Sequence, residues 1–308
     1  MNPSYLRMHQ SNQTFVVQLR KKRRSRQIIL RALLRLIRFP NLMIVALTQY
    51  LVRVCLVGPK GEWWNHLIDL HLLGLAFSTI CIAAAGYIIN DYYDIKIDTI
   101  NKPRRVVVGR IMSRRQAIFA HSFLNFLGIG IGTLIGLRIG LVNFIAAFLL
   151  WLYSNQLKRL PFIGNFIVAL LTAATLWVVV LYNPQNRLYV YTYSVFAFFI
   201  TLIREIIKDM EDVRGDATFG CRTLPIVWGI RRTKLFLYFL ILTFLITLYS
   251  FAPFLPERLI WYFSLFILLP MLWFVRQLVR ADTRSDFGYL SQICKLISVV
   301  GVVSMVFV

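Results

Sequence analysis

Nine long apolar stretches constrain the fold of this 308-residue chain more than any other feature. They cover residues 39–57, 68–90, 116–137, 139–157, 161–182, 189–207, 233–252, 258–277 and 287–308. A helix of about 20 mainly apolar residues is long enough to cross a bilayer. The composition, 58% hydrophobic with a mean hydropathy of +0.65, excludes an ordinary soluble domain. We therefore predict an all-α, polytopic membrane domain of nine transmembrane helices over residues 31–308, preceded by a disordered or loosely helical basic tail at residues 1–30.

Lysine and arginine are unevenly distributed between the two ends of the predicted spans. Of 35 such residues, 29 lie in the tail through Arg38 or in segments 93–115, 155–160, 204–234 and 276–284. Basic loops remain in the cytoplasm, so we expect a cytoplasmic N-terminus and cytoplasmic active-site loops, in the inner or plasma membrane if the chain is bacterial. This topology and an attraction to anionic membrane lipid explain the net charge of +22 without a nucleic-acid partner.

Two acidic clusters stand at the expected cytoplasmic ends of apolar stretches. Together they hold eight of the 13 acidic residues: Asp91, Asp94 and Asp98 in the first cluster, and Glu205, Asp209, Glu211, Asp212 and Asp216 in the second. Both clusters contain the spacing D-x-x-D-x-x-x-D. Offsets of three and four place side chains on one face of a helix, so each aspartate trio is expected to project together.

Carboxylates packed this closely beside a membrane repel one another, and something must offset that cost. A solvated helix end paired with local Arg and Lys would suffice for one cluster. Two clusters with identical spacing instead favour Mg²⁺, which one or two carboxylates hold together with substrate phosphates. Several basic residues on the same side could bind a diphosphate: Lys102, Arg105, Arg110, Lys158, Arg159, Arg204 and Lys208.

Other polar residues near the spans have simpler interpretations. Tyr153 and Lys158 end the fourth span, where an interfacial aromatic ring and a lysine reaching the surface are common. Asn41 follows Pro40 and can cap a helix. Lys295, inside the last span, is expected to extend toward the membrane surface rather than into a polar cavity. His121 is expected to hydrogen-bond between packed helices.

Three segments resemble the UbiA superfamily of intramembrane prenyltransferases. NDYYDIKIDTINKPRRVVVGRI is similar to its first motif and the loop that follows, and YSNQLKRLPFIGN to the segment after its fourth helix. REIIKDMEDVRGDATFGCRTLPIVWG resembles its second motif. Within the superfamily, these motif sequences most resemble the branch that makes digeranylgeranylglyceryl phosphate. The loop departs from the family pattern, because RVVVG stands where R-P-hydrophobic-x-S-G is usual.

The resemblance implies nine helices around a central cavity open to the cytoplasmic face. It also implies Mg²⁺-dependent transfer of a prenyl group, expected to be geranylgeranyl, from its diphosphate to a lipophilic acceptor, for which geranylgeranylglyceryl phosphate is the expectation. The residues that match catalytic and metal-binding positions are Asp91, Asp94, Asp209 and Asp212, with Asp98 and Asp216 as further metal positions and Tyr153 near the reactive carbon. Those that match diphosphate contacts are Asn90, Arg105, Lys158 and Lys208, and Asn41 is placed with them.

Three alternatives remain beside this interpretation. The same chemistry could use an aromatic acceptor such as 4-hydroxybenzoate, because acceptor pockets are built from variable apolar side chains. A divalent-cation transporter would need polar residues through the span centres, and these are nearly uncharged. A CDP-alcohol phosphotransferase would need a D-G-x-x-A-R type motif, which the chain lacks. Beyond prenyl diphosphate, acceptor and membrane lipid, no obligate protein partner is inferred.

Overall fold

The computed structural model describes residues 27–58, 61, 63–103, 106–182 and 187–308. Residues 27–36 are helical. The helices that follow are α2 (Phe39–Leu51), the π-helical η1 (Val52–Val57), α3 (Trp63–Leu67), α4 (Leu70–Tyr93), α5 (Ile95–Asn101), α6 (Arg114–Ile135), α7 (Leu137–Asn155), η2 (Leu157–Arg159), α8 (Ile163–Tyr182), α9 (Arg187–Thr218), α10 (Leu224–Ser250), η3 (Ala252–Phe254), α11 (Glu257–Phe263), the π-helical η4 (Ser264–Leu268), α12 (Leu269–Arg280), α13 (Arg284–Val303) and η5 (Ser304–Phe307).

The predicted membrane spans are confirmed. In the described part of the chain, nine helical segments are long and apolar enough to cross a membrane. They are Phe39–Val57, Leu70–Tyr93, Arg114–Ile135, Leu137–Asn155, Ile163–Tyr182, Arg187–Thr218, Leu224–Phe254, Glu257–Arg280 and Arg284–Phe307. The chain is therefore an all-α, multi-pass membrane protein. Large apolar side chains face outward, for example Phe126 at 79% exposure and Leu134 at 88%, as lipid contact requires.

The sixth span is longer than predicted. The predicted spans covered 189–207 and 233–252, whereas α9 continues to Thr218 and α10 begins at Leu224. The hydropathy of the sequence shows where the lipid-facing part of the helix ends. The helix itself continues through the charged residues, because their backbone groups still form helical hydrogen bonds. The turn that follows contains Gly220 at φ 73°, a left-handed conformation that glycine adopts at low cost.

Capping residues account for where several helices begin. Ser113 accepts a hydrogen bond from the backbone N–H of Gln116 at the start of α6, and the Gln116 side chain accepts one from the Ser113 N–H. Thr283 and Asp286 form the same reciprocal arrangement at the start of α13. Such pairs satisfy N–H groups that the first helical turn leaves free.

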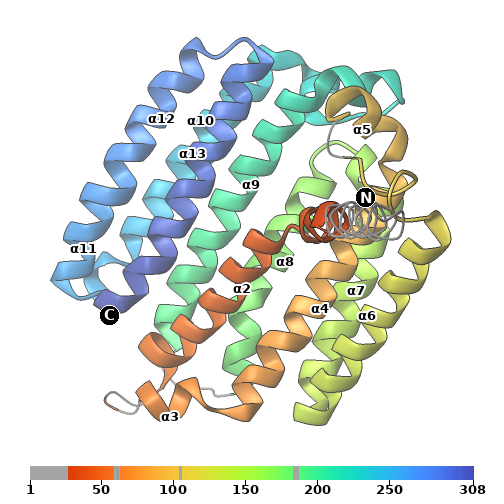
Figure 1. Cartoon of the computed structure of the whole chain (residues 1–308). Helices are drawn as coiled ribbons and strands as arrows, with labels where there is room; N and C mark the ends of the chain where they lie inside the picture. The colour runs from red at the N-terminus through yellow and green to blue at the C-terminus, as the bar shows by residue number, and fades with distance from the viewer. Residues whose placement is uncertain (1–26, 59–60, 62, 104–105, 183–186) are drawn as a thin grey trace, which may run out of the picture.

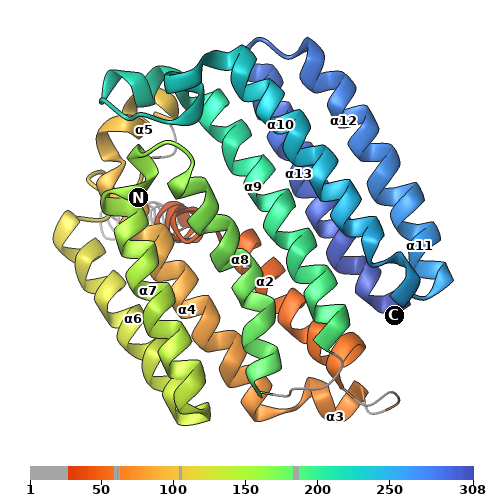
Figure 2. The same ribbon diagram turned by 180° about the vertical axis from the view of Figure 1, so that it is seen from behind.

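The helices form a bundle with α9 near its middle (Figures 1 and 2). Helix α9 packs against α8, α10 and α13, and α4 packs against α2, α6 and α7. The short α5 lies across one end of the bundle, beside the last turns of α9 (Figure 1). This arrangement brings the end of α4, which carries the first acidic cluster, toward the end of α9, which carries the second.

Candidate active site

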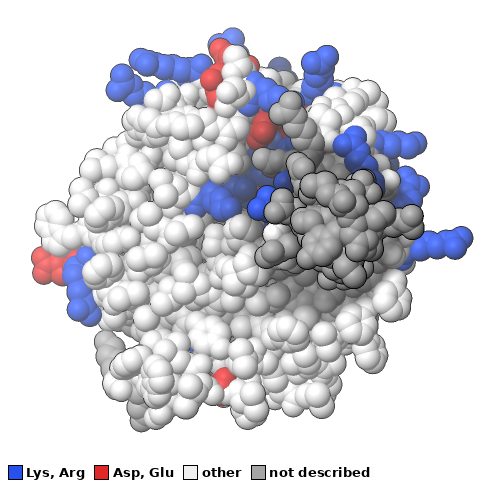
Figure 3. All heavy atoms as spheres, in the orientation of Figure 1, with Lys and Arg blue, Asp and Glu red and all other residues white. Residues whose placement is uncertain are grey.

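A cavity of about 1030 Å³ opens between helices α2, α4, α7, α8, α9 and α13. Lys and Arg side chains are visible inside a hollow in the face shown in Figure 3. All the predicted site residues that the structure describes line this cavity: Asn41, Asn90, Asp91, Asp94, Asp98, Tyr153, Lys158, Lys208, Asp209, Asp212 and Asp216. Arg105 lies outside the described residues. The remaining wall is largely apolar and includes Ile44, Val168 and Leu171.

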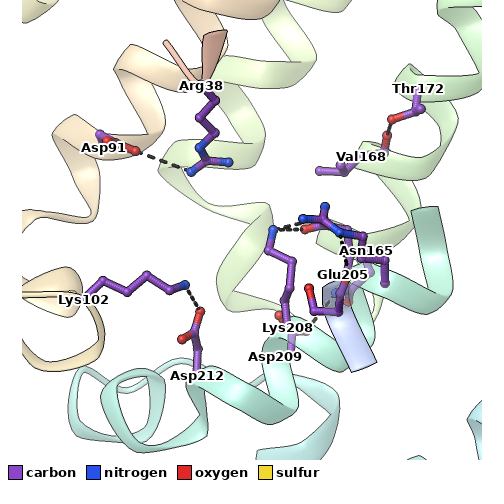
Figure 4. Close-up of polar contacts among 12 residues, drawn as sticks. Arg38, Asp91, Lys102, Asn165, Val168, Thr172, Glu205, Lys208, Asp209 and Asp212 are labelled. Atoms are coloured by element: carbon purple, nitrogen blue, oxygen red, sulfur yellow. Dashed lines mark hydrogen bonds and ion pairs between the residues drawn. The ribbon is translucent and has the colours of Figure 1, made fainter. Parts of the chain in front are cut away.

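The first cluster is shaped by a break in the helix. Asp94 has φ −88° and ψ 2°, and it separates α4 from α5. The expected single helical face for Asp91, Asp94 and Asp98 is therefore interrupted, although all three still reach the cavity. The Nζ of Lys158 donates to Asp94. Arg38 Nη2 lies 3.5 Å from Asp91 Oδ1 (Figure 4). Both carboxylates thus already face cations.

The second cluster lies on one uninterrupted helix, α9, as the spacing predicts. Lys102 Nζ donates to Asp212 Oδ2 at 2.5 Å, and Asn165 Nδ2 donates to Asp209 Oδ2 at 2.8 Å (Figure 4). The buried Glu205 lies one helical turn before Asp209, and Lys208 Nζ donates to both of its carboxylate oxygens, at 2.8 and 3.0 Å. Glu205 therefore holds a lysine beside the aspartates.

Asn101 joins the two clusters. Its side-chain Oδ1 accepts from the Gly215 N–H at 3.1 Å, and its Nδ2 donates to the Asp212 carbonyl at 3.2 Å. A Cβ at position 215 would overlap the Asn101 amide, so the close approach of α5 to α9 depends on glycine there. Arg284 donates to the Asn101 carbonyl and brings the start of α13 to the same point.

Three of the cavity aspartates, Asp98, Asp209 and Asp216, form no ion pair with a described residue, and Asp209 accepts from the Asn165 amide instead. Asp98 and Asp216 lie farther than 4.0 Å from every described basic group. Burial, followed by repulsion from Asp94 and Asp91, raises the pKa of Asp98 to about 6. The cavity thus has a region where negative charge exceeds positive charge.

The donor set fits a magnesium ion that is shared with a phosphate. No three described His, Cys, Asp or Glu side chains gather closely enough to hold a metal by themselves. Mg²⁺, however, usually takes one or two carboxylates and fills its remaining positions with water and substrate phosphate. Asp98 and Asp216 are free of ion pairs with described cations, and Asp212 Oδ1 is buried without a hydrogen-bond partner, with the Arg284 guanidinium 3.9 Å away. An unsatisfied buried carboxylate oxygen of this kind suits a cation.

Two expectations outside the clusters have different outcomes. His121 is confirmed as a helix-packing residue, since its Nδ1 lies 3.0 Å from the Ala85 carbonyl and Asn125 contacts its ring. The expectation for Lys295 is wrong. Its Nζ donates to Asn41 Oδ1 at 2.9 Å and lines the cavity, because a polar partner inside the bundle is within reach.

Three residues that organise the site were not among those predicted: Arg38, Asn101 and Asn165. Asn101 and Asn165 both fall inside segments that carry the family resemblance, which was the available signal. Arg38 was counted only as a basic residue of the tail. It contacts Asp91 and also stacks over the Tyr87 ring at 4.6 Å. Arg38 is the residue directly before α2, and a charge count does not reveal that its side chain turns toward Asp91.

The fold and the site together define a helical membrane protein in which two carboxylate clusters face one cavity. The model of the UbiA prenyltransferase family matches residues 46–288, so the chain belongs to that family. It is 38% identical over 168 residues to the digeranylgeranylglyceryl phosphate synthase of Pyrococcus abyssi, an alignment that covers 54% of this chain. The chain spans 60% of the length of that curated relative.

Solved structures share the fold. One described as a digeranylgeranylglyceryl phosphate synthase in membranes superimposes with a TM-score of 0.67 at 25% identity, over 91% of this chain and 98% of that one. A UbiA homologue from Archaeoglobus fulgidus, bound to GPP and Mg²⁺, superimposes with a TM-score of 0.61 at 17% identity, over 90% and 100% of the two chains. The arrangement of the described helices is therefore that of UbiA proteins.

Proposed function

We propose that this protein transfers a geranylgeranyl group from its diphosphate to geranylgeranylglyceryl phosphate in a Mg²⁺-dependent reaction that forms an ether lipid. One observation carries the proposal: carboxylates from α4, α5 and α9 meet in a cavity whose remaining wall is largely apolar. The charged part suits a diphosphate and the apolar part suits a prenyl chain. The name of the Pyrococcus abyssi relative supports the choice of acceptor.

The charged residues would bind the leaving group. Mg²⁺, when bound, supplies a Lewis acid that stabilises negative charge on the departing diphosphate. Asp91, Asp94, Asp209 and Asp212 would hold it, with Asp98 and Asp216 as further ligands. The cations now paired with these carboxylates, such as Lys158 and Lys102, would then be free to contact phosphate oxygens.

The rest of the cavity would protect the reactive carbon. As the C1–O bond to the diphosphate breaks, positive charge develops on the allylic carbon, and a low-dielectric wall keeps water away from it. The Tyr153 ring lines the cavity on α7 and would offer its electron-rich face to that charge. The acceptor hydroxyl then attacks C1, loses its proton and forms the ether bond.

The orientation in the membrane is part of the proposal. The loops that follow α4, α7, α9 and α12 all lie at the end where α5 sits, and Lys and Arg gather at this end (Figures 1 and 3). Since basic loops remain in the cytoplasm, this end and the N-terminus would be cytoplasmic. A water-soluble cation such as Mg²⁺ would then reach the cavity from the cytoplasm.

The test is a product assay with purified protein in nanodiscs. Labelled geranylgeranyl diphosphate is supplied with Mg²⁺ or with EDTA, and geranylgeranylglyceryl phosphate and 4-hydroxybenzoate are offered separately. The proposal predicts a Mg²⁺-dependent, doubly prenylated glyceryl phosphate. A prenylated benzoate alone would overturn the acceptor and keep the prenyl transfer. A lack of product with either acceptor, and of diphosphate binding, would overturn both.

A further inference from the structure

A second polar group lines the cavity beside the aspartate clusters, and the chemistry above does not use it. Lys295 on α13 donates to Asn41 Oδ1 on α2 at 2.9 Å. Arg204 on α9 faces the same helix α13, where its Nε lies 3.4 Å from the Ser291 carbonyl. All three side chains line the cavity, together with Gln292 and Ser298. Three helices therefore bring two cations and one amide to one region.

This region differs electrostatically from the diphosphate site. Arg38, Lys102, Lys158 and Lys208 each lie within ion-pair distance of a carboxylate. Lys295 contacts a neutral amide instead, and it forms no ion pair with any described carboxylate. Arg204 shares Glu205 with Lys208, at a longer distance of 3.4 Å. The Lys295 region therefore carries excess positive charge, whereas the Asp98 and Asp216 region carries excess negative charge.

The region lies beside the aspartates and not on top of them. Arg204 precedes Asp209 by five residues on α9, which is about 7.5 Å along a helix axis. On α2, Asn41 follows three residues after Arg38, which contacts Asp91. An anion held here would share the cavity with a diphosphate bound at the aspartates.

We propose that Lys295, with Asn41 and Arg204, binds the phosphate of the acceptor; this inference rests on the proposed function. A phosphomonoester offers oxygens to the Lys295 ammonium and the Arg204 guanidinium, both strong phosphate partners. Because Asn41 Oδ1 is occupied by Lys295, its Nδ2 is left to donate to another phosphate oxygen. The glycerol hydroxyl, only a few bonds away, is thereby held near the allylic carbon. Asn41 is thus reassigned from the prenyl diphosphate to the acceptor.

The other anion that could occupy this region is the prenyl diphosphate itself. The aspartate region already supplies four cations for that group, so the structure favours the acceptor phosphate. The two sources can be separated by kinetics. Removing a group that binds only the acceptor phosphate raises the KM of the phosphorylated acceptor. The KM of an acceptor without a phosphate should not change.

The experiment compares wild type with Lys295→Ala, Lys295→Arg and, as a matched control, Lys234→Ala. Lys234 contacts the exposed Asp282 and does not line the cavity. Each protein is assayed with geranylgeranylglyceryl phosphate and with unphosphorylated geranylgeranylglycerol, and the KM of geranylgeranyl diphosphate is measured in parallel. Elution as a single species in size-exclusion chromatography confirms folding.

For Lys295→Ala we expect the KM of the phosphorylated acceptor to rise about tenfold or more, as loss of a hydrogen bond to a charged group predicts. The preference for phosphorylated over unphosphorylated acceptor should fall by the same factor, with the diphosphate KM unchanged. Lys295→Arg should restore part of the preference, and Lys234→Ala should behave as wild type. An unchanged preference, or an equal rise in the diphosphate KM, would overturn the inference. Wild type that uses 4-hydroxybenzoate but no glyceryl phosphate would instead overturn the proposed function.

Discussion

Several carboxylates of the cavity are paired with cations from distant parts of the chain. Asp91 faces Arg38, Asp94 accepts from Lys158, and Asp212 accepts from Lys102. These contacts offset the repulsion within each cluster and keep the cations close to where phosphate oxygens would bind. The same side chains can therefore stabilise the substrate-free protein and, after exchange of partners, the bound diphosphate.

Removal of one motif carboxylate should abolish turnover without unfolding the protein. We expect Asp91→Asn, Asp94→Asn, Asp209→Asn and Asp212→Asn each to lower kcat/KM by about a hundredfold or more, because an amide retains the shape but loses the charge that binds Mg²⁺. Asp282→Asn, at an exposed surface position, is the control. The product assay provides the measurement, and full activity in any two of the four variants would refute the metal assignment.

Asp98 should make the Mg²⁺ affinity depend on pH. Its pKa of about 6 means that protons compete with Mg²⁺ for this carboxylate below that pH. One pH unit lower, the apparent affinity should fall about tenfold if Asp98 is a required ligand. The folding stability of the metal-free protein should change in the opposite direction to the Mg²⁺ affinity. Because the pKa of Asp98 is higher in the folded than in the unfolded chain, this stability falls as the pH rises from 3.8 to about 6.

The measurement is a Mg²⁺ titration of diphosphate binding between pH 5 and pH 8, with Asp98→Asn as the matched variant. In that variant the dependence on pH near 6 should be weaker than in wild type, because an amide does not titrate there. A wild-type affinity that stays constant across the range would show that Asp98 takes no part in metal binding.

Between elements, the critical contact is the one that α5 makes with α9. Asn101 binds both the Asp212 carbonyl and the Gly215 N–H, so the helix after the first cluster fixes the position of the second. Arg284 at the start of α13 closes the same junction. The two clusters are therefore held in register by an asparagine that itself need not touch the substrate.

Asn101→Ala should weaken catalysis through position and not through charge. We expect a loss of about 1–2 kcal/mol of stability, typical of two removed hydrogen bonds that leave backbone groups unpaired, with a rise in the Mg²⁺ concentration needed for half-maximal rate. Thermal unfolding in detergent and a Mg²⁺ titration of the rate measure the two effects. Asn125→Ala, which loses a side-chain contact to His121 far from the clusters, is the control. If only the stability changes, then Asn101 does not position the site.

For the molecule as a whole, hydropathy predicted the nine spans, although the sixth continues to Thr218 and the seventh begins at Leu224, well beyond the predicted ends. The duplicated aspartate spacing predicted which residues meet. Both signals are local and periodic. The inward position of Lys295 could not be predicted, because a helix that is apolar nearly all round does not show which face turns toward the bundle. The contact of Asn165 with Asp209 depends on how α8 crosses α9, and no single-sequence pattern encodes that crossing.

The orientation of the whole bundle can be tested by chemical labelling. Arg231 at the basic end and Arg138 at the opposite end are both exposed, and each can be replaced by cysteine. In intact cells the positive-inside rule predicts that a membrane-impermeant maleimide labels Arg138→Cys and not Arg231→Cys. Permeabilised cells should show both labels, which controls for reactivity. The reverse pattern in intact cells would place the cavity mouth outside the cytoplasm.

Whether the two carboxylate clusters hold a metal-bridged diphosphate is tested by the binding of an unreactive geranylgeranyl thiodiphosphate to the protein in nanodiscs, with Mg²⁺ or with EDTA. We expect saturable binding of one analogue per chain that requires Mg²⁺ and is lost when Asp94→Asn and Asp209→Asn are combined. Equal binding in EDTA, or undiminished binding by the double variant, would contradict the claim that two carboxylate clusters hold a metal-bridged diphosphate.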